Sequence, residues 1–209
     1  MNAEIPEPES ASLSEGQVHH HRTGHSWVDL SIALCAIVIS ISSLFVAILH
    51  GRTMEKMVTA SSLPYVQIDT SNTDAQGNTG IISLTALNAG VGPARIDKVV
   101  VTYQGKPIRD AFELLHACCE VSGEQRPSII TSMLSHRMIG SQKDLDFLVM
   151  RRTDDGAQTF ARFDQEREKL DIRACYCSVF DQCWIAALHA SKSEAVKSCE
   201  ALAGVEYKD

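Results

Sequence analysis

The sequence predicts one transmembrane α-helix followed by a mainly-β domain with one or two short helices. Residues 30–49 form an uncharged apolar run, and beyond Pro64 apolar and polar residues alternate between groups of turn-forming residues. About 160 residues remain after the helix, which is enough for one domain with its own hydrophobic core. We therefore expect one anchor and one domain.

Residues 1–26 are predicted to be a disordered tail. They contain few large apolar side chains, two prolines and several acids, so they bury too little surface to offset the entropy of ordering. The tail also carries closely spaced imidazoles, which are able to hold a transition metal: His19, His20, His21 and His25. A solvated polar run is the simpler interpretation, and we expect no metal there.

Residues 27–50 are predicted to be the membrane anchor. As a helix, the twenty residues from Leu30 to Leu49 span about 30 Å, which matches the hydrocarbon core of a bilayer. A signal peptide has a basic leader and a shorter apolar core, so an uncleaved anchor is expected. Residues 51–63 are predicted to be a juxtamembrane linker, helical at first and ended by Pro64.

Small residues recur along one face of this anchor, spaced by three and four positions: Ala33, Ala36, Ser40, Ser43 and Ala47. Such a face lets two helices approach closely, which suggests a homodimer formed through the anchor. Ser and Ala also occur in single spans without this role.

Residues 64–209 are predicted to form the β domain. The alternation of apolar and polar residues predicts two strands. The first has Val66 and Ile68 on its buried face, and the second has Ile82, Leu84 and Ala86 on its buried face. Three further β-rich segments are residues 97–105, 128–133 and 144–150, and the last of these has Leu145, Phe147 and Val149 on one face. Residues 172–188 are predicted to form a hairpin that turns at Asp181 and Gln182.

The connections and helices between these strands have their own signals. Gly90 and Gly92, which permit positive φ, are expected in a bulged crossing between adjacent strands. Asp110 is expected to cap a short helix with Phe112, Leu115 and Cys119 on one face. Residues 159–170 fit a short amphipathic helix or a charged loop, and residues 191–202 look helical.

The sequence contains a recognisable motif with three parts. These are a strand that ends at Asn88, the run from Gly90 to Ala94, and a valine-rich strand that ends before Gly105. Together with the anchor and the Pro64-Tyr65 strand, it resembles small single-span bacterial membrane proteins of unassigned activity that have an immunoglobulin-like domain. The resemblance covers roughly residues 28–105, and more faintly the hairpin near 172–188, and provides no catalytic residues. It implies an immunoglobulin-like antiparallel β-sandwich in the bacterial envelope, anchored in the inner membrane.

Two features point to opposite sides of that membrane. Arg22 precedes the helix and Arg52 and Lys56 follow it, so the positive-inside rule favours a cytoplasmic domain by one charge. Six cysteines lie outside the helix, and disulfides persist mainly in oxidising compartments. We expect a periplasmic domain, with free buried cysteines in a reducing cytoplasm as the alternative.

Four cysteines gather near the C-terminus: Cys175, Cys177, Cys183 and Cys199. Disulfides are favoured over free thiols, and free thiols over zinc, because zinc ligands usually pair at a spacing of two to four residues. A bridge from the hairpin to Cys199 is expected, since the C-terminal segment shows little apolar surface to hold it.

The predicted function is a non-enzymatic interaction module that is integral to the membrane and binds a protein partner without a cofactor. The net charge of −7 and the lack of a basic face exclude the usual nucleic-acid surface. The alternative is a thiol- or metal-dependent enzyme that uses the C-terminal cysteines with His116 and His189. No acid–base pair, nucleophile motif or phosphate loop supports this enzyme.

Overall fold

The computed structural model of this chain describes residues 26–74, 77–119, 121 and 127–208. The chain divides into two compact units, residues 1–52 and 53–209. Apart from Ser26, the tail that is predicted to be disordered lies outside the described residues, and so do the histidines within it.

The longest element is helix α1, Ser26–Ala60. Its apolar side chains are exposed around the whole circumference, and Leu34 and Phe45 are both 63% exposed. A helix of this length and composition is able to cross a membrane, and a signal sequence near an N-terminus has the same features. The helix continues beyond Gly51 to Ala60, so the first part of the predicted linker is helical.

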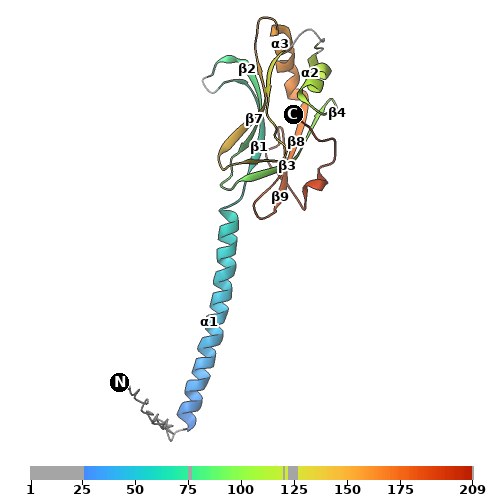
Figure 1. The fold of residues 1–209 in the computed structure, drawn as a ribbon. Helices are drawn as coiled ribbons and strands as arrows, with labels where there is room; N and C mark the ends of the chain where they lie inside the picture. The colour runs from blue at the N-terminus through green and yellow to red at the C-terminus, as the bar shows by residue number, and fades with distance from the viewer. Residues whose placement is uncertain (1–25, 75–76, 120, 122–126, 209) are drawn as a thin grey trace, which may run out of the picture. The chain divides into compact units, whose positions relative to one another are not determined.

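Among the described residues, ten strands form two antiparallel sheets (Figure 1). The four-stranded sheet has the order β1-β2-β7-β5, with bounds Val66–Thr73, Thr79–Asn88, Lys143–Arg151 and Ser128–Thr131. The six-stranded sheet has the order β10-β9-β8-β3-β4, and β6 also pairs with β3. Its bounds are Glu194–Val196, Cys183–Ala187, Leu170–Cys177, Ala94–Tyr103, Lys106–Ile108 and, for β6, Arg137–Ile139. This confirms the coarse prediction of an apolar helix followed by a mainly antiparallel β domain.

Two hydrophobic clusters lie on opposite faces of the six-stranded sheet. The main core joins both sheets, because it contains Ile68 and Leu84 from the first sheet together with Ile172 and Tyr176 from the second. The smaller cluster lies on the other face, beneath the C-terminal segment: Val100, Cys175, Ile185 and Leu202. Both faces of β8 are therefore buried.

Strand β7 departs from simple alternation at Phe147, the extra residue of a β-bulge. Successive residues of β2 pair with the residues on either side of it. Beyond the bulge, Leu148 and Met150 face the main core in place of Val149. The single face predicted for residues 144–150 is therefore wrong after the bulge.

Gly90 and Gly92 lie in the connection from β2 to β3, which passes from one sheet to the other. The predicted bulged crossing between adjacent strands is wrong because the two strands belong to different sheets, and neither glycine uses the positive φ that it permits. Close approach explains the glycines instead. A Cβ on Gly90 would lie 2.6 Å from the Leu63 carbonyl oxygen, and one on Gly92 would overlap the Ser62 carbonyl.

The buried side chain of Asn88 fixes this connection. Its Oδ1 accepts hydrogen bonds from the backbone N–H groups of Tyr65 and Gly90, both at 3.1 Å. Its Nδ2 donates to the carbonyls of Gly92 at 2.8 Å and Ile139 at 3.2 Å. One satisfied amide thus ties together the chain segments at which β1 and β3 begin and β6 ends.

Helix α2, Ala111–Cys119, begins where Asp110 Oδ1 accepts a hydrogen bond from Glu113 N at 2.8 Å. The predicted cap is therefore confirmed. The predicted buried face is wrong at Phe112, which is 64% exposed, whereas Leu114 is fully buried. Two residues correspond to about 200° around a helix, so these two side chains point in nearly opposite directions.

Helix α3, Ala157–Glu166, settles the choice left open for residues 159–170, and the 3-10 helix η1, Arg167–Lys169, follows it. The two phenylalanines of α3, Phe160 and Phe163, are buried in the main core. In Figure 1, α2 and α3 lie together at one end of the domain.

The C-terminal segment, predicted to be helical over residues 191–202, forms β10 and the 3-10 helix η2, Cys199–Ala201. The open edge of β9 explains the difference, because β10 pairs with it. Leu202 and Tyr207 are buried, and the Tyr207 ring packs edge-on against Phe147 with 6.5 Å between centroids. The expectation of little apolar surface in this segment is therefore wrong.

Candidate functional site

Four cysteines meet on the face of the six-stranded sheet that lies beneath the C-terminal segment. Along β8, Tyr176 belongs to the main core, so alternation directs Cys175 and Cys177 to the opposite face. The hairpin register pairs Cys177 with Cys183 of β9. Cys199 reaches them from the start of η2. These residues are called the four-cysteine cluster below.

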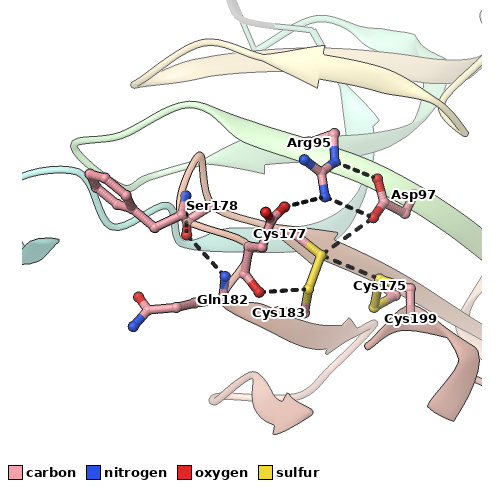
Figure 2. Close-up of a disulfide and its surroundings, with 10 residues drawn as sticks. Arg95, Asp97, Cys175, Cys177, Ser178, Gln182, Cys183 and Cys199 are labelled. Carbon is pink, nitrogen blue, oxygen red and sulfur yellow. Dashed lines mark hydrogen bonds and ion pairs between the residues drawn. A yellow bond between two sulfur atoms is a disulfide. The ribbon is translucent and has the colours of Figure 1, made fainter. Parts of the chain in front are cut away.

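Figure 2 shows how the cluster is paired: Cys175 is bonded to Cys199, and Cys177 is bonded to Cys183. The two disulfides are neighbours, since Cys177 Sγ lies 3.7 Å from Cys199 Sγ. The Sγ atoms of Cys177, Cys183 and Cys199 all lie within 4.8 Å of one another. Cys199 is partly exposed and the other three cysteines are buried.

The remaining cysteines of the described residues are apart from this cluster. Cys118 and Cys119 are bonded to each other at the end of α2. Cys35, in α1, is free and exposed. All six cysteines outside α1 are therefore paired.

Charged side chains line one side of the four-cysteine cluster. Asp97 is the extra residue of a bulge in β3, and its Oδ2 lies 3.3 Å from Cys177 Sγ. A disulfide sulfur carries no proton, so this contact becomes a hydrogen bond only when Cys177 is a thiol. Arg95 donates from Nε to Asp97 at 2.9 Å and from Nη2 to Asp181 at 3.0 Å. The hydrogen bond to Asp97 is the main reason that the pKa of Arg95 is raised.

The turn of the β8–β9 hairpin, residues 178–182, is here called the hairpin tip. It has five residues, so the predicted two-residue turn is wrong. Ser178 Oγ accepts hydrogen bonds from the N–H groups of Phe180 at 3.2 Å and Gln182 at 3.3 Å, and Ser178 N donates to the Gln182 carbonyl at 2.8 Å. Val179 and Phe180 nevertheless remain 51% and 49% exposed.

The two candidate catalytic histidines are not part of the cluster. His116 is exposed on α2, and His189 follows β9 with its Nε2 3.5 Å from Glu168 Oε2. His189 lies in the turn after β9, at the opposite end of that strand from Cys183. In the part of the chain that the structure describes, the side chains close enough together to share a metal ion are those of Cys177, Cys183 and Cys199, and neither histidine is among them.

The small residues of the anchor share one face of α1 and are exposed: Ala36, Ser40, Ser43 and Ala47. Ser40 Oγ donates to the Ala36 carbonyl at 2.8 Å, which satisfies its hydroxyl within the helix. Homodimerisation through this face stays a prediction.

Sequence reasoning missed Arg95, Asp97 and the exposed pair Val179 and Phe180. The sequence does carry a signal for the bulge at Asp97. Three charged residues, Arg95, Asp97 and Lys98, come directly before three valines, and this pattern indicates an interruption of the strand. The exposure of Val179 and Phe180 had no signal, because apolar residues in a β-rich segment normally indicate a buried face.

No protein-family model and no curated protein matches this chain. Its function is therefore inferred from the chemistry of the four-cysteine cluster, the hairpin tip and α1.

Proposed function

We propose that this protein is a non-enzymatic interaction module held in a bacterial inner membrane by α1, with an immunoglobulin-like β domain in the periplasm that binds a protein partner. The observation that carries the proposal is the hairpin tip, where Val179 and Phe180 are half-exposed on a loop with a fixed backbone. Aromatic and apolar anchors on rigid loops are typical of the energetic centre of protein interfaces.

The hairpin tip is also preorganised. The Cys177–Cys183 bond closes its base, Ser178 holds its backbone, and Arg95 fixes Asp181 by an ion pair. Because the loop is already ordered, a partner that covers Phe180 loses little loop entropy on binding. Less of the binding free energy is then lost to ordering the loop.

The pairing of all six cysteines outside α1 supports the periplasmic location. Disulfides persist in oxidising compartments and are rare in a reducing cytoplasm. The positive-inside rule opposes this location by one charge, which is a weaker consideration than three bonded pairs.

The exposed apolar surface of α1 supports the anchoring part of the proposal. A helix that is apolar all round is stable in a bilayer, where its backbone groups are satisfied internally. We expect the full-length chain to stay in the membrane fraction after carbonate washing. Release of a fragment that starts near Ser61 would show that α1 is a cleaved signal sequence.

Site-specific photocrosslinking tests the role of the hairpin tip. A benzophenone side chain in place of Phe180 should give one dominant crosslinked protein in cells. The same side chain in place of Phe112, the exposed phenylalanine of α2, should not give this product. Val179→Ser combined with Phe180→Ser should also prevent capture of that protein by a crosslinker at Gln182. Equal products from positions 180 and 112, or none at position 180, would contradict the proposal.

The alternative, an enzyme that uses the cysteines with His116 and His189, gains no support from the geometry. These histidines are exposed, and neither belongs to the group of clustered ligand atoms. General acid–base catalysis requires the base within hydrogen-bond reach of the group that it activates.

A further inference from the structure

We propose that the four-cysteine cluster is also a zinc site, which forms when its two disulfides are reduced. The ligands are the thiolates of Cys175, Cys177, Cys183 and Cys199. This inference goes beyond the proposed interaction function and does not depend on it, because zinc binding requires no partner at the hairpin tip, although the Cys177–Cys183 bond also closes the base of that tip.

The positions of the sulfur atoms are the first support. Tetrahedral zinc with Zn–S bonds of about 2.3 Å places its sulfurs about 3.8 Å apart. Cys177 Sγ and Cys199 Sγ are already 3.7 Å apart, and Cys183 Sγ lies within 4.8 Å of both. Cys175 Sγ, which is bonded to Cys199, lies outside this group of three sulfurs, so once the disulfides are reduced its side chain has to rotate to complete the tetrahedron.

The framework is the second support, because it holds the ligands without the metal. The ladder between β8 and β9 fixes Cys177 opposite Cys183. The segment that carries Cys199 is held by the buried Leu202, whose carbonyl accepts a hydrogen bond from Lys98 Nζ at 2.7 Å. Pairing across a hairpin replaces the short spacing that zinc motifs usually show in sequence.

The surrounding charge is the third support. Zinc with four thiolates carries a net charge of about −2 and needs cations nearby. Lys98 supplies one from β3, next to Asp97; the charge of Arg95 is already offset by the two carboxylates that it contacts, those of Asp97 and Asp181. The Asp97 carboxylate is already paired with Arg95, which limits its repulsion of the thiolates.

The disulfide-bonded form and the zinc-bound form of the four-cysteine cluster exclude each other, because the same four sulfur atoms take part in both. Two molecules of a dithiol reduce the two disulfides to four thiols and are themselves oxidised to two disulfides. Zinc then binds the four thiolates and displaces their protons to water. The metal form therefore belongs to the chain before its disulfides form, or after a dithiol has reduced them.

The test uses the full-length protein in detergent, reduced with a phosphine and titrated with Co²⁺ and then Zn²⁺. One equivalent of Co²⁺ should give the visible absorption of a tetrahedral thiolate complex, and Zn²⁺ should remove it. The histidines of the tail are replaced by alanine in every sample (His19, His20, His21 and His25), because imidazoles also bind these ions.

Matched variants assign the ligands. Cys177→Ser and Cys199→Ser should each weaken Co²⁺ binding and lower the intensity of the thiolate absorption, whereas the double variant Cys118→Ser and Cys119→Ser should leave both unchanged. An undiminished spectrum in Cys177→Ser, or a diminished one in the α2 double variant, would overturn the proposal. X-ray absorption of the zinc-loaded protein with its cysteines intact guards against misfolded variants. It should find four sulfurs at about 2.3 Å, and three or fewer would overturn the site.

Discussion

The backbone of Gly92 lies so close to Ser62 that a Cβ on residue 92 would overlap the Ser62 carbonyl. Leu63 O accepts hydrogen bonds from Val91 N and Gly92 N, both at 3.1 Å. The segment that joins α1 to β1 is therefore packed directly on the connection from β2 to β3. This contact makes that segment part of the domain.

Gly92→Ala should lower the free energy of unfolding of the domain by about 2 kcal/mol or more, since a backbone overlap is not relieved by rotating a side chain. Chemical denaturation measures the change. Gly140→Ala is the matched control, because its Cβ would meet only Lys143 Cγ at 3.5 Å. Equal stability of the two variants would refute the close packing at Ser62.

Ser40→Ile should reduce crosslinked dimer in membranes if the small residues of α1 form a contact face, because a large side chain prevents close approach of two helices. Ser42→Ile is the control. Ser42 Oγ donates to the Val38 carbonyl at 2.8 Å as Ser40 Oγ does to Ala36, but it lies about 200° around the helix from Ser40. A dimer yield that neither substitution changes would remove this face from consideration.

Tyr103 connects β3 to α3, because its hydroxyl donates to Glu166 Oε2 at 2.5 Å. This hydrogen bond, helped by burial, raises the pKa of Tyr103 above the ordinary 10.0. The stabilisation by neutral Tyr103 is therefore complete below pH 10 and is lost as the pH rises through the raised pKa.

Glu166→Gln should bring the pKa of Tyr103 back toward its ordinary value, and absorbance of tyrosinate during an alkaline titration measures it. Tyr103→Phe identifies which transition belongs to this residue. Glu168→Gln should leave the transition unchanged, since Glu168 pairs with Arg167 and His189. A Tyr103 transition that does not respond to Glu166→Gln would contradict the assigned cause.

Cys199→Ser should lower the melting temperature under oxidising conditions and have no effect in the presence of a reductant. The Cys175–Cys199 bond closes a loop with a sequence separation of 24, for which the chain-entropy model gives about 3.5 kcal/mol. Cys35→Ser, at the free cysteine of α1, should leave the melting temperature unchanged. The same decrease for Cys199→Ser in fully reduced protein would indicate that packing of Cys199, rather than the bond, stabilises the segment.

The sequence was sufficient for the strands whose faces stay constant. Val66, Ile68, Ile82 and Leu84 are buried as alternation predicts, because no bulge interrupts β1 or β2 at these positions. It was insufficient where a bulge changes the face, as at Phe147, since one extra residue reverses the sides and leaves little trace in composition.

The candidate site was also predictable from the sequence only in part. The sequence singled out Cys175, Cys177, Cys183 and Cys199 because cysteine density is a compositional signal. It did not determine their pairing, which depends on the register of β8 and β9 and on where the C-terminal segment returns. Asp97 enters the site only because a bulge in β3 lies opposite the cluster.

The state of the four-cysteine cluster in cells tests the central claim most directly. Intact cells are alkylated before lysis, and the protein is digested with trypsin without reduction. Cleavage after Arg173, Lys192, Lys197 and Lys208 places three of the cysteines in residues 174–192 and the fourth in residues 198–208. A disulfide-containing periplasmic domain predicts these two peptides joined to each other, with no alkyl group on any of the four cysteines. Separate peptides with three alkyl groups on residues 174–192 and one on residues 198–208 would contradict the account.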